Sequence, residues 1–116
     1  MLEKPHKRLD VWQKSILLTE KIYELTKSFP GTETYGLTNQ MRRAAISIPG
    51  NISEGAARQT KKEFIQFLHV AQGSLSELDT QLEICEKLGY LKQNSVYEIS
   101  ILMGNIDKML TGLIKS

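Results

Sequence analysis

The sequence lacks most features that mark specialised classes of protein. Its single cysteine, Cys85, cannot form an internal disulfide bond, so packing or association must stabilise the fold. Only 3 prolines and 8 glycines leave little room for a low-complexity linker, and no apolar run approaches the roughly 18 residues of a membrane span. The first residues also lack the apolar segment of a signal peptide, so we expect a cytoplasmic protein with no membrane partner.

What is present is the composition of one globular domain. The chain has 116 residues, of which 41% are hydrophobic and 24% charged, and its net charge is +2. We expect residues 1–116 to form a single domain, with residues 1–8 as a mobile basic tail. So small a charge excess does not by itself indicate a polyanionic partner, and the composition reveals no reaction.

Apolar residues recur at spacings of three and four in four segments, which is typical of amphipathic helices. The expected helices cover about residues 10–28, a segment from Leu37 onward, residues 61–88, and a segment from Asn94 or Ser95 onward. Three of them begin with a capping-box pattern: Asp10 with Gln13, Thr60 with Glu63, and Ser95 with Glu98. No segment alternates long enough to indicate a strand, so the expected fold is all-α, an antiparallel up-down-up-down four-helix bundle.

Pro49 interrupts the second of these segments. A proline inside a helix cannot donate a hydrogen bond to the carbonyl four residues earlier, here that of Ala45, and it bends or divides the helix. Because Ala45 and Ile48 keep their phase with Ile52 across the proline, the pattern predicts one bent helix.

The second segment carries few charged residues. A helix that exposes one side to solvent would be expected to carry more lysine and glutamate on that side. Beside its apolar stripe lie a polar stripe and a face of small residues, and the residues expected at an oligomer interface are Arg43, Ile46, Ser47, Gly50, Asn51, Ser53, Glu54 and Ala57. A helix in a four-helix monomer has only one inward face, so coverage on further sides indicates a contact between subunits. The alternative is that the small residues merely accommodate the bend at Pro49.

Basic residues concentrate near the N-terminus and around the second segment. The candidate phosphate ligands are Lys4, Lys7, Arg8, Arg42, Arg58, Lys61 and Lys62. No aromatic residue is interleaved among them, so the pattern favours phosphate contacts with structured RNA or duplex DNA over base stacking. The alternative interpretation is a solvated positive surface.

Candidates for catalysis or metal binding are scarce. Cys85 lies on an apolar stripe, which is typical of a small buried hydrophobe, and no Glu-x-x-His motif occurs. We therefore expect no enzyme activity, no cofactor and no metal ion. An enzymatic alternative would use Glu54 with Arg43 or Asn51, but Glu54 is better placed to pair with Arg58 at i+4.

The most distinctive motif of the chain is QMRRAAISIPGNISEG, at residues 40–55. It closely resembles the bacterial four helix bundle protein family, known as the 23S rRNA intervening-sequence proteins. The resemblance extends to LDVW at residues 9–12 and to EFIQFL and AQGSLSEL at residues 63–68 and 71–78. It implies a small helical bundle that assembles into a ring-like homopentamer, is often encoded within insertions in large-subunit rRNA genes, and has no established enzymatic activity.

A more distant resemblance is to the accessory proteins of diversity-generating retroelements. Those proteins are pentameric barrels that bind nucleic acid and a reverse transcriptase, and they are more basic than this chain at +2. Two hypotheses follow from these patterns. The first is a non-enzymatic oligomeric scaffold that binds nucleic acid, and the second is a protein-interaction scaffold, with a reverse transcriptase or another protein as partner and no direct nucleic-acid contact.

Overall fold

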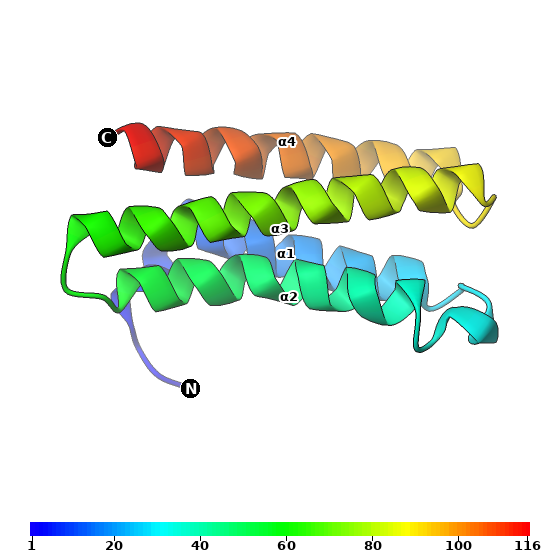
Figure 1. The fold of residues 1–116 in the computed structure, drawn as a ribbon, viewed down its shortest axis with the longest axis horizontal. Helices are drawn as coiled ribbons and strands as arrows, with labels where there is room; N and C mark the ends of the chain where they lie inside the picture. The colour runs from blue at the N-terminus through cyan, green and yellow to red at the C-terminus, as the bar shows by residue number, and fades with distance from the viewer.

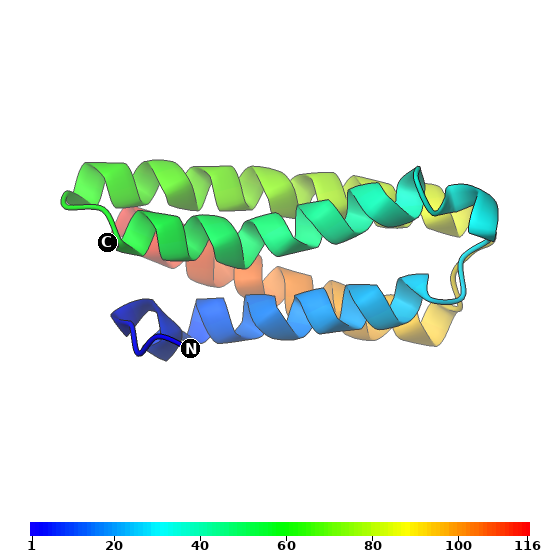
Figure 2. The same ribbon diagram turned by 90° about the horizontal axis from the view of Figure 1, so that it is seen from below.

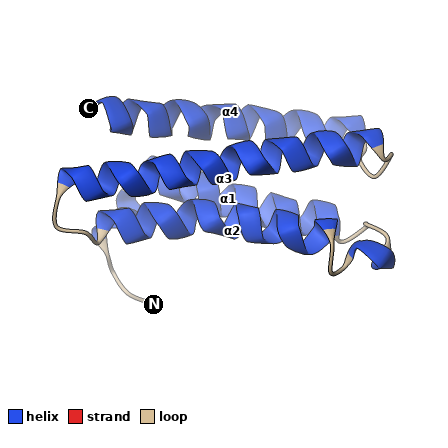
Figure 3. Ribbon diagram, viewed as in Figure 1, coloured by secondary structure: helices blue, strands red, loops and turns tan.

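The computed structural model describes residues 1–116 as helices joined by short connections, without any strand (Figure 3). The long helices are α1 (Asp10–Thr26), α2 (Leu37–Ala56), α3 (Lys61–Lys87) and α4 (Gln93–Lys115). Two short 3-10 helices, η1 (Pro5–Arg8) and η2 (Gly31–Glu33), precede α1 and α2. The expected all-α class and the number of helices are confirmed.

The four helices lie side by side in a molecule with dimensions of 43 × 27 × 20 Å (Figure 1). Packing is most extensive between α2 and α3, and α1 also contacts α4. The connection between α2 and α3 lies at one end of the molecule, and the other two connections lie at the opposite end (Figure 1). We name the end that holds the connection between α2 and α3 the α2–α3 end. At this end also lie η1, the start of α1 and the end of α4 (Figure 1).

The apolar stripes of the sequence form the core. On α3, the buried members of the stripe are Leu68, Ala71, Leu75, Leu78, Leu82 and Cys85. Stripes of the other three helices meet this row. The buried hydroxyl of Ser15 donates to the Trp12 carbonyl of its own helix at 2.7 Å. Removal of this apolar surface from water is the main source of stability.

Helix α2 continues through Pro49, as the apolar phase predicts, and its axis changes direction along its length (Figure 2). Pro49 has no amide hydrogen, so the Ala45 carbonyl receives no bond from it. The hydroxyl of Thr19 on α1 donates to that carbonyl at 3.3 Å and to the Ser15 carbonyl at 2.9 Å. The hydroxyl has one hydrogen and shares it between the two carbonyls, so the neighbouring helix replaces part of the hydrogen bonding that the proline removes.

Only one of the three predicted capping boxes has a capping side chain. Thr60 is the N-cap of α3, and its hydroxyl accepts a hydrogen bond from the Glu63 amide at 3.1 Å. The prediction for Asp10 is wrong because α1 already begins there, with Leu9 as its N-cap and no capping side chain. The prediction for Ser95 is wrong for the same reason, since α4 begins at Gln93.

Within residues 1–8, which the sequence predicts to be a mobile basic tail, Pro5–Arg8 form η1. This 3-10 helix packs against α1 and α2. The His6 ring contacts the Trp12 ring edge-on with centroids 5.3 Å apart, and the Gln13 side chain donates to the Lys7 carbonyl at 2.9 Å. These contacts with α1 give the basic segment a defined position.

Gly55 is needed where the last turn of α2 approaches α3. A Cβ at this position would lie 2.7 Å from Phe67 Cβ and 3.2 Å from the Phe64 carbonyl oxygen. We expect Gly55→Ala to lower the free energy of unfolding by about 1–3 kcal/mol, because backbone must move to admit the methyl group. Gly73→Ala is the matched control in open space, and it should stabilise α3 by about 0.5–1 kcal/mol. Denaturant unfolding measures both, and equal effects would contradict the close approach.

Candidate nucleic-acid interface

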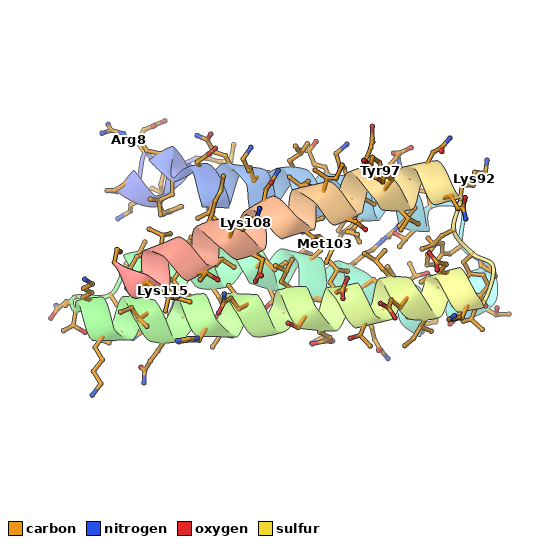
Figure 4. All side chains as sticks on the ribbon, turned by 90° about the horizontal axis from the view of Figure 1, so that it is seen from above. Arg8, Lys92, Tyr97, Met103, Lys108 and Lys115 are labelled. Carbon is orange, nitrogen blue, oxygen red and sulfur yellow. The ribbon has the colours of Figure 1, made fainter.

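Six of the seven predicted phosphate ligands lie at the α2–α3 end. Lys4, Lys7 and Arg8 lie in or beside η1, which packs against α2, while Arg58, Lys61 and Lys62 lie in the turn to α3 and its first residues. Figure 4 shows Arg8 and Lys115 at this end and Lys92 at the opposite end. The fold thus joins two basic segments that are far apart in the sequence.

Three of these six cations are bonded within the fold, and the other three are available to an anion. Arg58 pairs with Glu54, with 2.7 Å between Nη2 and Oε1, as the i+4 spacing predicts. Lys61 Nζ donates to the Ser116 backbone oxygen at 2.6 Å. The ammonium of the half-buried Lys7 donates to the Leu2 carbonyl oxygen. The remaining three are exposed and have no ion pair: Lys4, Arg8 and Lys62. Such unpaired, exposed charges attract phosphate groups without reading base sequence.

Arg42 lies apart from the other candidates, in the second turn of α2 near the opposite end. It is separated from Arg58 by roughly 20–25 Å along the helix at about 1.5 Å per residue. Its Nε donates to the Thr26 hydroxyl at 2.9 Å, and its guanidinium lies 4.5 Å from the centroid of the Tyr23 ring. Arg42 therefore ties α2 to α1, and the structure does not bring it to the basic cluster.

Two of the residues expected at an oligomer interface lie in the seam between α2 and α3 of one chain. The Ser47 and Ser74 hydroxyl oxygens are 2.8 Å apart. The Asn51 amide donates to the Ser47 carbonyl at 2.7 Å and to the Ser47 hydroxyl at 2.9 Å. Helix α3 thus covers the middle of the polar stripe, while Arg43 and Glu54 on the same stripe are exposed.

The other interface candidates line the outer side of α2. Exposed there are Arg43, Ile46, Gly50, Glu54 and Ala57, and Ser53 is half-buried. Ile46 is 48% exposed, so a large apolar side chain stands on this outer side among small and polar residues.

Helix α1 extends this outer surface with residues that the sequence reasoning missed. Ile16 and Tyr23 are 36% and 37% exposed, and they share a stripe with Thr19, which contacts α2. A signal was present in the consecutive run Ile16-Leu17-Leu18, because three successive apolar side chains on a helix cannot all face one core. We name the surface formed by Ile16, Tyr23, Ile46, Gly50, Ser53 and Ala57 the α1–α2 face.

The groups considered for catalysis are engaged or buried. Burial, and to a smaller extent the charge of Glu33, raises the pKa of the Cys85 thiol to about 11, and Sγ lies 3.4 Å from Met41 Sδ in the core. The Glu54 carboxylate contacts Arg58, and the Asn51 amide contacts Ser47. No three His, Cys, Asp or Glu side chains cluster as metal ligands would. None of the helices has both the length and the apolar character to cross a membrane.

The fold and its surface define a class: a small all-helical protein of four long helices with a basic end. The chain matches the family model described as 23S rRNA-intervening sequence protein over residues 7–112, and it belongs to this family. Among solved structures it is similar to a protein of unknown function from the S23 ribosomal protein family of Bacteroides thetaiotaomicron, with 25% identity and a TM-score of 0.81. That similarity covers 91% of this chain and 99% of the other. No curated protein matches the chain. The resemblance carried by residues 40–55 is thereby confirmed.

Proposed function

We propose that this protein is a non-enzymatic, homo-oligomeric helical scaffold that binds structured RNA or duplex DNA. The observation that carries the proposal is the gathering of six basic side chains at the α2–α3 end, from two distant segments of the chain. Cations of this kind displace the counterions of a phosphate backbone and supply affinity with little sequence preference. The proposal places the scaffold in the cytoplasm, where the unpaired Cys85 stays reduced.

The oligomer in this proposal is a ring of antiparallel up-down-up-down bundles. A homopentamer is the stoichiometry that the resemblance implies, and the α1–α2 face supports association because it exposes Ile16, Tyr23 and Ile46 beside small residues. One chain at net charge +2 would bind a polyanion weakly. Several copies of the basic cluster on one particle would raise the affinity through multivalency.

Gly50→Glu should dissociate the oligomer and weaken nucleic-acid binding at the same time. A Cβ at Gly50 meets no atom within 4 Å, so the single chain accommodates the substitution. At a subunit contact, however, the charged side chain would lose its hydration without a partner. Light scattering should report a smaller particle, and the affinity for RNA should fall about tenfold or more with the loss of multivalency.

Gly104→Glu is the matched control, because a Cβ on this α4 glycine also meets no atom within 4 Å. It should leave both the particle mass and the affinity unchanged. A 13.2 kDa monomer for the unmodified protein at micromolar concentration would contradict the oligomer.

The second candidate function is a protein-interaction scaffold that does not contact nucleic acid. The outer flank of α3 favours it, since Val70, Ile84 and Leu88 are 50%, 45% and 52% exposed and their spacing places them on one side of the helix. A reverse transcriptase or another protein would be the partner. An intact oligomer without affinity for RNA or DNA would favour this candidate.

A further inference from the structure

An open cleft lies between η1 and the turn that joins α2 to α3. Its volume is about 370 Å³, and its lining includes His6, Leu9, Arg58, Lys61 and Phe64. This volume falls in the range of about 300–1,000 Å³ that is usual for small-ligand sites. The cleft is therefore large enough for one flat organic group, and it lies within the basic cluster.

Two aromatic rings line this cleft, one from His6 in η1 and one from Phe64 in α3. The ring of Phe64 is half-buried beside Gly55, where a Cβ would lie 3.1 Å from Phe64 Cδ1. The ring of His6, which also lines the cleft, is held edge-on against Trp12 with centroids 5.3 Å apart. Both rings are thus positioned by the fold before any ligand arrives.

Cationic groups line the same cleft. The guanidinium of Arg58 lies 4.9 Å from the centroid of the Phe67 ring and pairs with Glu54. Lys61 also lines the cleft, and Gln59 adds an exposed amide that can both donate and accept hydrogen bonds. The cleft therefore combines apolar ring surface with positive charge.

We propose that this cleft takes one unstacked nucleotide of a bound RNA. The base would lie against Phe64 and His6, and its phosphate would lie near Arg58 and Lys61. Proteins recognise looped or bulged RNA by this combination of aromatic stacking and phosphate contacts. The inference rests on the proposed nucleic-acid function and adds to it, because phosphate contacts alone do not distinguish a bulge from a regular duplex.

The test compares the affinity of the full-length protein for two RNA duplexes that differ by a single bulged 2-aminopurine nucleotide. The bulged duplex should bind about tenfold more tightly, the size of effect that stacking of one base produces. The emission of 2-aminopurine should change on binding, because its base moves onto an aromatic ring.

Phe64→Leu should reduce the preference for the bulged duplex to less than about twofold while leaving the affinity for the regular duplex unchanged. His6→Ala should act in the same direction, and it keeps the test decisive if Phe64→Leu disturbs the fold, since His6 lies outside the core. Tyr97→Leu is the control, because Tyr97 is 71% exposed and lies toward the opposite end (Figure 4).

Each of the remaining outcomes would contradict a specific part of the proposal. Equal binding of the two duplexes would overturn the nucleotide site and leave the proposed function standing. Binding of neither duplex would overturn both. A bulge preference that survives Phe64→Leu and His6→Ala would show that the nucleotide binds elsewhere, and an equal affinity for free adenosine monophosphate would overturn the assignment to RNA.

Discussion

Leu78→Ala should lower the free energy of unfolding by about 2–5 kcal/mol. Leu78 has 0% exposure and lies near the middle of α3, the helix that packs most extensively against α2. Truncation removes apolar contacts and leaves a cavity, and a close-packed helix interface relaxes only partly around it. Denaturant unfolding measures the change, at one fixed protein concentration because association would add to the apparent stability.

Ile84→Ala on the same helix is the matched control for this prediction. Ile84 is 45% exposed, so its truncation should change the free energy of unfolding by less than about 1 kcal/mol. If Leu78→Ala also changed stability by less than about 0.5 kcal/mol, the α3 stripe could not be the centre of the core.

The triple variant Arg58→Gln, Lys61→Gln and Lys62→Gln should weaken binding to every RNA and DNA sequence. Each lost phosphate contact should lower the slope of log affinity against log salt by about 0.7–0.9, so three contacts correspond to at least a hundredfold loss of affinity at low salt. The oligomer should stay intact, since none of the three residues lies on the α1–α2 face. Fluorescence anisotropy titrations over a range of salt concentrations measure both quantities.

A second triple variant separates a local site from the effect of total charge. Lys21→Gln, Lys27→Gln and Lys92→Gln remove the same number of charges around a cleft at the opposite end. This variant should lose much less affinity than the first. Equal losses would mean that net charge, rather than the α2–α3 end, determines binding.

Periodicity predicted the helices well because each of them buries one stripe, and a stripe of apolar residues is visible in the sequence. The ends of the helices were less predictable. Leu9 and Lys92 take the extended backbone conformation of an N-cap without any capping side chain, and this choice depends on how the preceding segments pack. The sequence also did not predict the hydrogen bond from Thr19 to the Ala45 carbonyl, because this bond joins two different helices.

The sequence predicted which basic residues belong to the candidate site, but it did not predict where the fold places each of them. Arg42 and Arg58 lie on the same segment of the sequence, yet most of the length of α2 separates them. Arg42 instead contacts Tyr23 and Thr26 of α1. His6 and Phe64 both lie beside basic residues in the sequence, but their distance along the chain hid that the two rings share a cleft. Only the tertiary fold brings these two segments to one cleft.

The central claim is that an oligomer of this chain binds nucleic acid through the α2–α3 end. The most direct measurement is a titration of the unmodified protein with structured RNA and with duplex DNA over a range of salt concentrations, with the particle mass determined in the same buffers. The account predicts a stable multiple of 13.2 kDa that binds both ligands at low salt and loses affinity steeply as salt rises. An intact oligomer that binds neither RNA nor DNA at low salt would contradict it.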